Sequence, residues 1–189
     1  DMSAGRSAEN IEYAELQITS NFSFLRGASH PDEFALQAAA LGHRAIGIAD
    51  RNSLAGVVRA HLGAKQADIP LLVGARLDLE DGVSLLAYPE DRVAYGRLSR
   101  LITLGRRRAP KGECELSRED VFDHGRGMVL IVLPPSLNYQ DAFERELAAL
   151  REAFSGYVYL AASHSLHGDD DERLDILHAI ATRADVPMV

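Results

Sequence analysis

Short continuous apolar runs alternate along the chain with longer stretches in which apolar residues recur every three or four positions. Such short runs are typical of strands buried on both faces of a sheet. They lie at Tyr13–Ile18, Ala45–Ala49, Leu71–Leu79, Ser84–Tyr88, Met128–Leu133, Tyr157–Ala161 and Val186–Val189. The periodic stretches predict helices, which lie at Pro31–Leu41, Ser53–Gln66, Asp91–Leu104, Ser117–Asp123, Tyr139–Phe154 and Asp170–Ala184.

This alternation predicts the fold class. Repeated strand, helix and strand units with right-handed crossovers give an α/β fold with a mainly parallel sheet, which periodicity leaves either open or closed into a barrel. A length of 189 residues fits one domain, and we expect a polar tail over residues 1–12 followed by that domain over residues 13–189. The chain stops inside an expected strand, so we expect the domain to be incomplete at its carboxyl end.

The composition, with 47% hydrophobic and 25% charged residues, is that of a globular protein. No apolar run approaches the roughly 18 residues that a membrane span needs, and the first residues lack the apolar segment of a signal peptide. Cys114 is the only cysteine, so no internal disulfide can form. We therefore expect a cytoplasmic protein with no membrane partner.

The formal net charge of −8 argues against a domain that grips nucleic acid by itself, because phosphate neutralisation needs clustered cations. One short stretch is an exception, and Gly105 and Pro110 predict a loop inside it. A solvated loop and a contact with a phosphate backbone or an acidic partner both stay open. Its cations are Arg97, Arg100, Arg106, Arg107, Arg108 and Lys111.

Ligand sites of parallel α/β folds lie at the carboxyl ends of the strands. The first three expected strands end in polar residues, among them Gln17, Thr19, Asp50, Arg51 and Arg76. The chain contains no Walker loop, no dinucleotide-binding glycine pattern and no nucleophile elbow. The strand ends are therefore the place to look for function.

The segments ELQITSNFSFLRGASHPDEF, ALGHRAIGIADRNSLAGVVRAH and PLLVGARLDL resemble the polymerase and histidinol phosphatase (PHP) domain at the amino end of bacterial C-family DNA polymerases. The segments YGRLSRLITLGRRRAPKGEC and LIVLPP make the chain most similar to the error-prone, damage-induced branch of that family. The similarity covers essentially the whole chain after residue 12. It implies a distorted PHP-type (β/α)7 barrel that lacks its last strand or strands.

Active PHP domains carry a His-x-His pair after the first strand, an Asp-His pair after the second and a Glu after the third. These side chains, with later His and Asp residues, hold metal ions that generate hydroxide and clamp the attacked phosphate. The matching positions here read Gln17, Thr19, Asp50, Arg51 and Arg76. Because an amide and a hydroxyl replace imidazoles poorly and two guanidiniums carry permanent positive charge, the resemblance implies a former metal site without catalytic residues.

We expect a polar and ionic network in its place, with Asp50 paired to Arg51 or Arg76 so that no buried charge is unpaired. The weak candidates for a remaining metal site are His164, His167 and Asp169. The same segment can equally be a loop that leads into an acidic helix start.

The first functional hypothesis is a metal-free, non-catalytic domain that supports the core of an error-prone DNA polymerase in damage-induced synthesis. The resemblance then implies Mg²⁺-dependent nucleotidyl transfer outside these residues, and the other polymerase domains, template and primer DNA, and translesion accessory proteins as partners. The alternative is a metal-dependent phosphoesterase or 3′–5′ exonuclease with a reduced ligand set. A third hypothesis is a module that docks DNA or a partner through Arg106, Arg107, Arg108 and Lys111.

Overall fold

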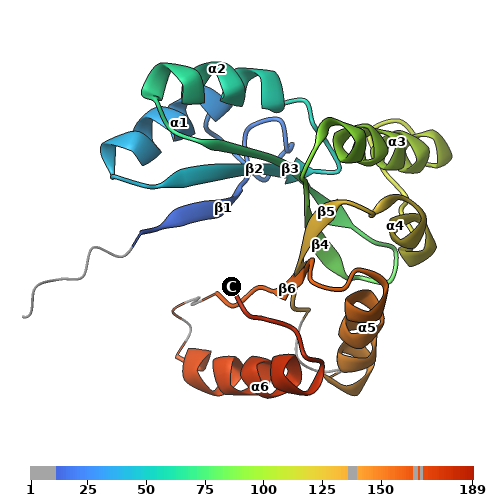
Figure 1. Cartoon of the computed structure of the whole chain (residues 1–189). Coiled ribbons are helices and arrows are strands. Elements are labelled where there is room, and N and C mark those ends of the chain that lie inside the picture. Colours follow the sequence, from blue (N-terminus) through green and yellow to red (C-terminus); the bar gives the residue numbers. More distant parts are fainter. Residues whose placement is uncertain (1–11, 136–139, 164–165, 167) are drawn as a thin grey trace, which may run out of the picture.

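The computed structural model describes residues 12–135, 140–163, 166 and 168–189. Strands and helices alternate as the sequence predicts (Figure 1). The strands are β1 (Ala14–Ile18), β2 (Ala45–Arg51), β3 (Leu71–Asp78), β4 (Ser84–Pro89), β5 (Met128–Leu133) and β6 (Val158–Leu160). The helices are α1 (Pro31–Ala40), α2 (Val57–Ala67), α3 (Arg92–Arg108), α4 (Arg118–His124), α5 (Gln140–Ala153) and α6 (Asp170–Arg183).

The described strands form one sheet in the order β1-β2-β3-β4-β5-β6. Strands β1, β2 and β3 are parallel, β4 is antiparallel to both of its neighbours, and β6 is parallel to β5. The antiparallel step follows from the tight turn after β3, where Gly82 takes a left-handed φ of 87° and donates its N–H to the Leu79 carbonyl. The sheet curls into a half-barrel (Figure 1), so the predicted α/β class is confirmed.

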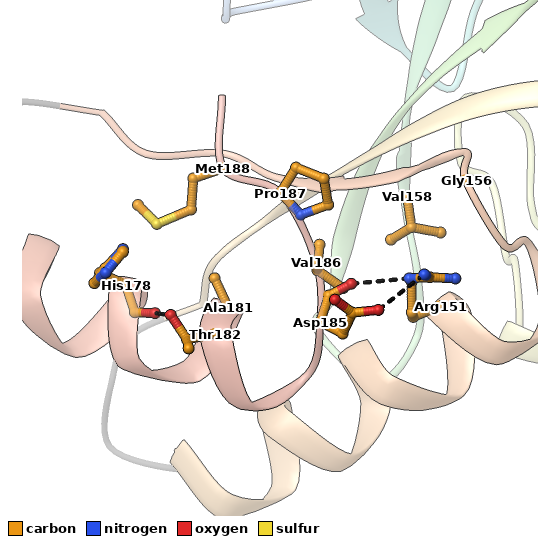
Figure 2. Close-up of a pocket in the computed structure, with 10 residues that line it drawn as sticks. All are labelled: Arg151, Gly156, Val158, His178, Ala181, Thr182, Asp185, Val186, Pro187 and Met188. Atoms are coloured by element: carbon orange, nitrogen blue, oxygen red, sulfur yellow. Dashed lines mark hydrogen bonds and ion pairs between the residues drawn. The ribbon is translucent and has the colours of Figure 1, made fainter.

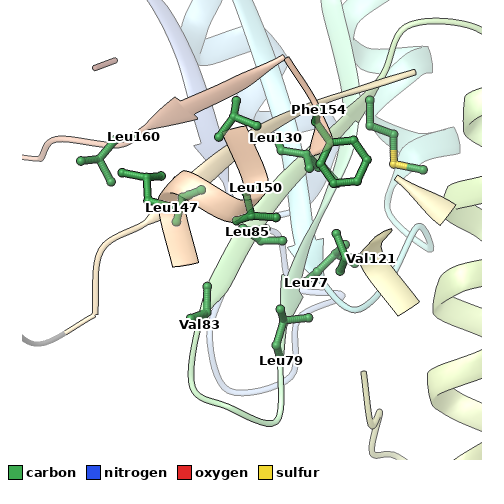
Figure 3. Close-up of a cluster of buried hydrophobic side chains, with 14 of the residues drawn as sticks. Leu77, Leu79, Val83, Leu85, Val121, Leu130, Leu147, Leu150, Phe154 and Leu160 are labelled. Carbon is green, nitrogen blue, oxygen red and sulfur yellow. The ribbon is translucent and has the colours of Figure 1, made fainter. Parts of the chain in front are cut away.

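Helices cover the convex face of the sheet in two groups. Helices α1 and α2 pack on β1 and β2, where Ile18, Ile46 and Ile48 are buried. The larger core lies beneath the remaining helices (Figure 3), with Leu77, Leu85, Leu130 and other strand residues against apolar residues of α3 to α6. Burial of this apolar surface is the main force that holds the curled sheet together.

The concave face is filled by the Tyr88 side chain of β4. Its hydroxyl donates a hydrogen bond to the Leu16 carbonyl of β1, across the curl of the sheet. Gly47 and Gly74 make room for it, because a Cβ at either position would come within 2.8 Å of the Tyr88 side chain. Burial raises the pKa of Tyr88, and so does the negative charge of Glu15. The inside of the half-barrel is therefore packed at this level.

Two expected elements differ from the structure. The segment after Val186 forms only a single parallel bridge between Met188 and Leu160, where we expected a strand. The expected loop at Gly105 is helical, since α3 continues to Arg108. Gly105 is buried there, and a Cβ would come within 2.8 Å of Leu116 and Cys114, so this glycine serves close packing and not a turn.

The expected start of the helix at Ser117 is confirmed, because its hydroxyl accepts the Asp120 N–H and the Asp120 carboxylate accepts the Ser117 N–H. Across the residues described, no helix combines the length and apolar character needed to cross a membrane.

Candidate functional site

The carboxylate of Asp50, at the end of β2, is enclosed by the turn that follows β1. Its side chain is 1% exposed. Oδ1 accepts hydrogen bonds from the Ser20 N–H at 2.8 Å and the Ser23 hydroxyl at 2.7 Å, and Oδ2 accepts the Ser20 hydroxyl at 2.8 Å. Three donors on one carboxylate compensate for much of the cost of burying it.

The Asp50 carboxylate also lies against the start of α2. A Cβ at Gly56 would come within 2.5 Å of Asp50 Oδ2, so glycine allows the carboxylate to lie this close to the helix backbone. The positive end of the helix dipole is there, and it favours a negative group. The expected pairing of Asp50 with Arg51 or Arg76 is therefore wrong: successive residues of a strand point to opposite faces, and Asp50 faces the serines while Arg51 faces away.

The two arginines share a different carboxylate, that of Asp78 in β3. Arg51 forms an ion pair with Oδ2, Arg76 Nε lies 2.8 Å from Oδ1, and the Ser84 hydroxyl donates to Oδ1 at 2.7 Å. Burial raises the pKa of Asp78, but the hydrogen bonds from Ser84, Arg76 and Arg51 lower it by more, so this pKa lies below its ordinary value. These side chains share one face because β2, β3 and β4 pair in register there.

Asn52 connects this ionic cluster to the basic stretch. It takes a left-handed φ of 46°, its side-chain oxygen accepts the Asp78 N–H at 3.1 Å, and its backbone oxygen accepts Arg106 Nε at 3.0 Å. Arg108 holds the carboxylate of Asp120 with two hydrogen bonds. The four cations from Arg106 to Lys111 are all exposed, but Arg106 and Arg108 are tied to the fold by these contacts, while Arg107 and Lys111 have no hydrogen bond or ion pair among the described residues.

A hollow of about 550 Å³ opens at the ends of β2 and β3. Arg51, Asn52 and Asp78 form its floor, and two exposed aromatic side chains of the turn after β1 stand at its rim, Phe22 and Phe24. Cys114 also lines it, but burial raises the pKa of this thiol, which disfavours the thiolate that nucleophilic chemistry needs.

Gln17 and Thr19 do not join this hollow. A register shift in β1 between Glu15 and Ile18 changes which side chains face the sheet interior. Gln17 is exposed, and together with Thr19 it lines a separate hollow of about 490 Å³ beside α1. The five positions that the resemblance matches to a metal site thus lie in three places, and of these residues Arg51 and Arg76 share one carboxylate.

The weak metal candidates contribute little that the structure describes. His164 and His167 lie outside the described residues. Asp169 is exposed and precedes α6 without a side-chain capping bond. Nowhere in the described ranges do three or more His, Cys, Asp or Glu residues gather in a way that could hold a metal ion.

Another hollow, of about 520 Å³, lies between α5, α6 and the last residues (Figure 2). Arg151 crosses it and donates to both the carbonyl and the carboxylate of Asp185, at 2.8 and 2.9 Å. Asp185 takes a left-handed φ of 53° at the turn after α6. This arrangement fixes the end of α6, so we assign it a structural role.

Ser20 and Asp78 lie among the polar residues that follow the first and third expected strands, but sequence reasoning gave neither of them a partner, and it missed Ser23 and Ser84. The contact between Asp78 and Arg76 has a signal in the sequence, because Asp78 lies two positions after Arg76 and so on the same face of a strand. The contacts of Ser20 and Ser23 with Asp50 have none, since the turn that carries these serines is 27 to 30 residues from Asp50 in the chain.

A family model described as the PHP domain matches residues 15–173. The error-prone DNA polymerase of Caulobacter vibrioides is 51% identical over 178 residues, and error-prone DNA polymerase 1 of Agrobacterium fabrum is 45% identical over 177 residues. Each alignment covers 94% of this chain but 16% of the relative, so the chain spans about one-sixth of their length.

Among solved structures, a protein of Bifidobacterium adolescentis assigned to the metal-dependent phosphoesterases superposes with a TM-score of 0.68. The match covers 94% of this chain and 86% of that protein, at 17% sequence identity. This likeness shows the shared fold.

Proposed function

The chain belongs to the PHP domain family, and from this premise we propose that it is the non-catalytic PHP domain of an error-prone DNA polymerase. The observation that carries the proposal is that each of the two strand-end carboxylates already accepts three hydrogen bonds from the protein's own donors. Asp50 accepts three hydrogen bonds from two serines, and Asp78 is held between two guanidiniums. These donors occupy most of the acceptor sites of each carboxylate, which a metal cluster would need for itself.

The donor set also does not fit metal ions in its chemistry. A guanidinium cannot lose its proton in a protein and repels a cation, so Arg51 and Arg76 are unsuited to the place of imidazole and carboxylate ligands. Gln17 and Thr19 lie in another hollow. We derive no hydrolytic step from these residues, and the domain instead stabilises the polymerase.

The turn after β1 supplies a surface for that role. Phe24 and Leu25 are each 85% exposed, and Phe22 is 44% exposed. Asp50 fixes the turn through Ser20 and Ser23, so these apolar side chains are presented in a defined arrangement. Exposed apolar groups on a rigid loop mark interaction sites. Because the relatives are about six times as long as this chain, the occupant we propose is another segment of the same polymerase chain.

The wider activity follows from the relatives. The parent protein would synthesise DNA across damaged template in the bacterial cytoplasm, with Mg²⁺-dependent nucleotidyl transfer in a different domain, and with template, primer and accessory proteins as its partners. A PHP domain without hydrolytic activity suits such an enzyme, because it would not remove nucleotides placed opposite a lesion.

A metal-dependent phosphoesterase or 3′–5′ exonuclease is the second candidate, favoured by the fold that this chain shares with the Bifidobacterium protein. Hydrolysis of bis-p-nitrophenyl phosphate and of a single-stranded oligodeoxynucleotide, with Mn²⁺, Zn²⁺ or Mg²⁺ added, separates the two. We expect no activity above the buffer rate. Metal-dependent hydrolysis that Asp50→Asn or His167→Ala abolishes would establish the phosphoesterase instead.

The docking surface has its own test. Phe24→Ser combined with Leu25→Ser should leave the melting temperature of this chain unchanged, because both side chains are exposed. The same pair should lower the melting temperature of the full-length polymerase. An unchanged melting temperature of the full-length polymerase would refute the docking role. The control is Val58→Ser, at a 72% exposed position of α2.

A further inference from the structure

The outer side of α3 carries a groove of about 660 Å³ that the proposed function does not use. It lies where α3 and α4 run beside each other at the edge of the molecule (Figure 1). Its lining contains three guanidiniums, two hydroxyls and one imidazole, with no carboxylate: Ser99, Arg100, Thr103, Leu104, Arg107, Arg108 and His124. This composition is unusual for a chain whose net charge is −8.

The basic residues of α3 fall into two groups. Arg97 donates to the Arg126 carbonyl, Arg106 to the Asn52 carbonyl, and Arg108 to the Asp120 carboxylate. In contrast, Arg100 and Arg107 are exposed and have no hydrogen bond or ion pair within the part of the chain that the structure describes. Arg92, in the first turn of α3, is also exposed and without a partner among the described residues, but it lies outside the groove. Two of the three unpaired cations of the helix therefore lie in the groove.

Helical spacing places the two free cations on one line. The buried side of α3 consists of Ala94, Leu98, Leu101, Ile102 and Gly105, which leaves Arg100, Thr103 and Arg107 on the outer side. Arg100 and Arg107 are seven residues apart, or about 10.5 Å along the helix. One strand of B-form DNA carries about three phosphates over that length.

Contacts within the fold hold the neighbouring polar groups in place. The Thr103 hydroxyl donates to the Ser99 backbone carbonyl at 2.7 Å, whereas the Ser99 hydroxyl has no partner among the described residues and can donate to a ligand. His124 Nδ1 lies 3.0 Å from the Asp120 carbonyl oxygen, so Nδ1 carries the proton and donates. The Arg108 guanidinium is held in place by Asp120 beside them. The site is therefore partly organised before any ligand arrives.

We infer that this groove, the α3 groove, binds the phosphodiester backbone of DNA through Arg100 and Arg107. Two exposed guanidiniums on one line, with no carboxylate in the lining of the groove, can contact phosphates about three apart on one strand. Contacts to phosphates carry no sequence information directly, so we expect binding that is independent of sequence. The anion site stands on the geometry alone, whereas the choice of DNA rests on the proposed function.

The test is fluorescence anisotropy with a labelled single-stranded oligodeoxynucleotide and this chain, titrated at several salt concentrations. Arg100→Glu combined with Arg107→Glu should weaken binding at low salt by about tenfold or more, and the slope of log K against log salt should fall by about 1.4, from 0.7 for each lost phosphate contact. Arg100→Gln with Arg107→Gln should give the same loss of slope with a smaller loss of affinity.

The matched control is Arg92→Glu combined with Arg145→Glu, which changes the net charge equally at exposed positions outside the groove. It should lower affinity little and leave the slope unchanged. Equal weakening by both pairs, or wild-type binding by the Arg100 and Arg107 pair, would refute the site, as would an absence of binding by the wild-type chain at low salt.

Inorganic phosphate as competitor separates a nucleic acid from a small phosphate ligand. We expect phosphate to displace the oligonucleotide only as strongly as chloride at the same ionic strength. Displacement at millimolar phosphate would mean that the ligand is a free phosphate compound and not DNA. These outcomes are independent of any hydrolytic activity, so they can fail while the proposed function stands.

Discussion

Asp50 and Asp78 are carboxylates at the ends of neighbouring strands, yet the protein stabilises them in opposite ways. Asp50 is 1% exposed and is held by hydroxyl and amide donors, with no ion pair in the described structure. Asp78 remains partly exposed, at 17% of its side chain, and lies between two arginines. Acidic residues at strand ends can therefore have a structural role. Asp50 fixes the turn after β1, and Asp78 links β2, β3 and β4.

Asp50 should contribute more to stability than Asp78, because its carboxylate is buried more deeply and water cannot replace a lost hydrogen-bond partner there. Asp50→Ala would leave two serine hydroxyls and one amide without an acceptor. We expect urea unfolding to show a loss of about 3 kcal/mol in the free energy of unfolding. Asp175→Ala, at an exposed position of α6, is the control and should change stability by less than about 0.5 kcal/mol. Equal losses of stability in the two variants would mean that Asp50 contributes no more than an exposed carboxylate.

The next largest loss of stability should come from a substitution that crowds the Asp50 carboxylate. Gly56→Ala places a Cβ 2.5 Å from Asp50 Oδ2 and should destabilise the chain by about 1 to 3 kcal/mol. Gly96→Ala in α3 meets nothing within 4 Å and should stabilise the helix by up to about 1 kcal/mol. Thermal melts of the two variants should therefore shift in opposite directions. A gain in stability from Gly56→Ala would show that the contact is loose.

Asp78 should give a smaller effect that depends on pH. Asp78→Asn removes the charge between two arginines, and we expect a loss of about 1 to 2 kcal/mol at neutral pH. Because the folded pKa of Asp78 lies below its ordinary value of 3.8, its charge stabilises the fold above that value, and this contribution disappears as the pH falls through the folded pKa. Unfolding curves of wild type and variant should converge in acid. A constant difference at every pH would contradict the ion pairs.

The smallest losses of stability should come from substitution of the two arginines that hold Asp78. Arg51→Gln and Arg76→Gln should each cost about 0.5 to 1 kcal/mol, since both side chains are about one-third exposed, at 36% and 30%. Their effects should not add, because the two guanidiniums share the Asp78 carboxylate. A double-mutant cycle measures this coupling, and strict additivity would mean that the two arginines contribute independently of each other.

The fold was largely predictable, because short apolar runs such as Met128–Leu133, repeated between helical patterns, favour buried strands. The helix start at Ser117 was also predictable, since a capping box is a local pattern. The contacts between residues far apart in the chain were not predictable. Asp50 could be placed at a strand end, but its serine partners depend on how a distant turn folds back over it, and local propensity at Gly105 indicated a turn where tertiary packing imposes a helix.

The central claim is that the strand ends of this PHP domain are closed by internal polar contacts and hold no metal cluster. Elemental analysis of the purified chain, after incubation with excess Mn²⁺ and Zn²⁺ and removal of unbound ions by gel filtration, tests it most directly. We predict far less than one bound ion per chain, with the same value for Asp50→Asn. A stoichiometric metal that Asp50→Asn removes would contradict the account.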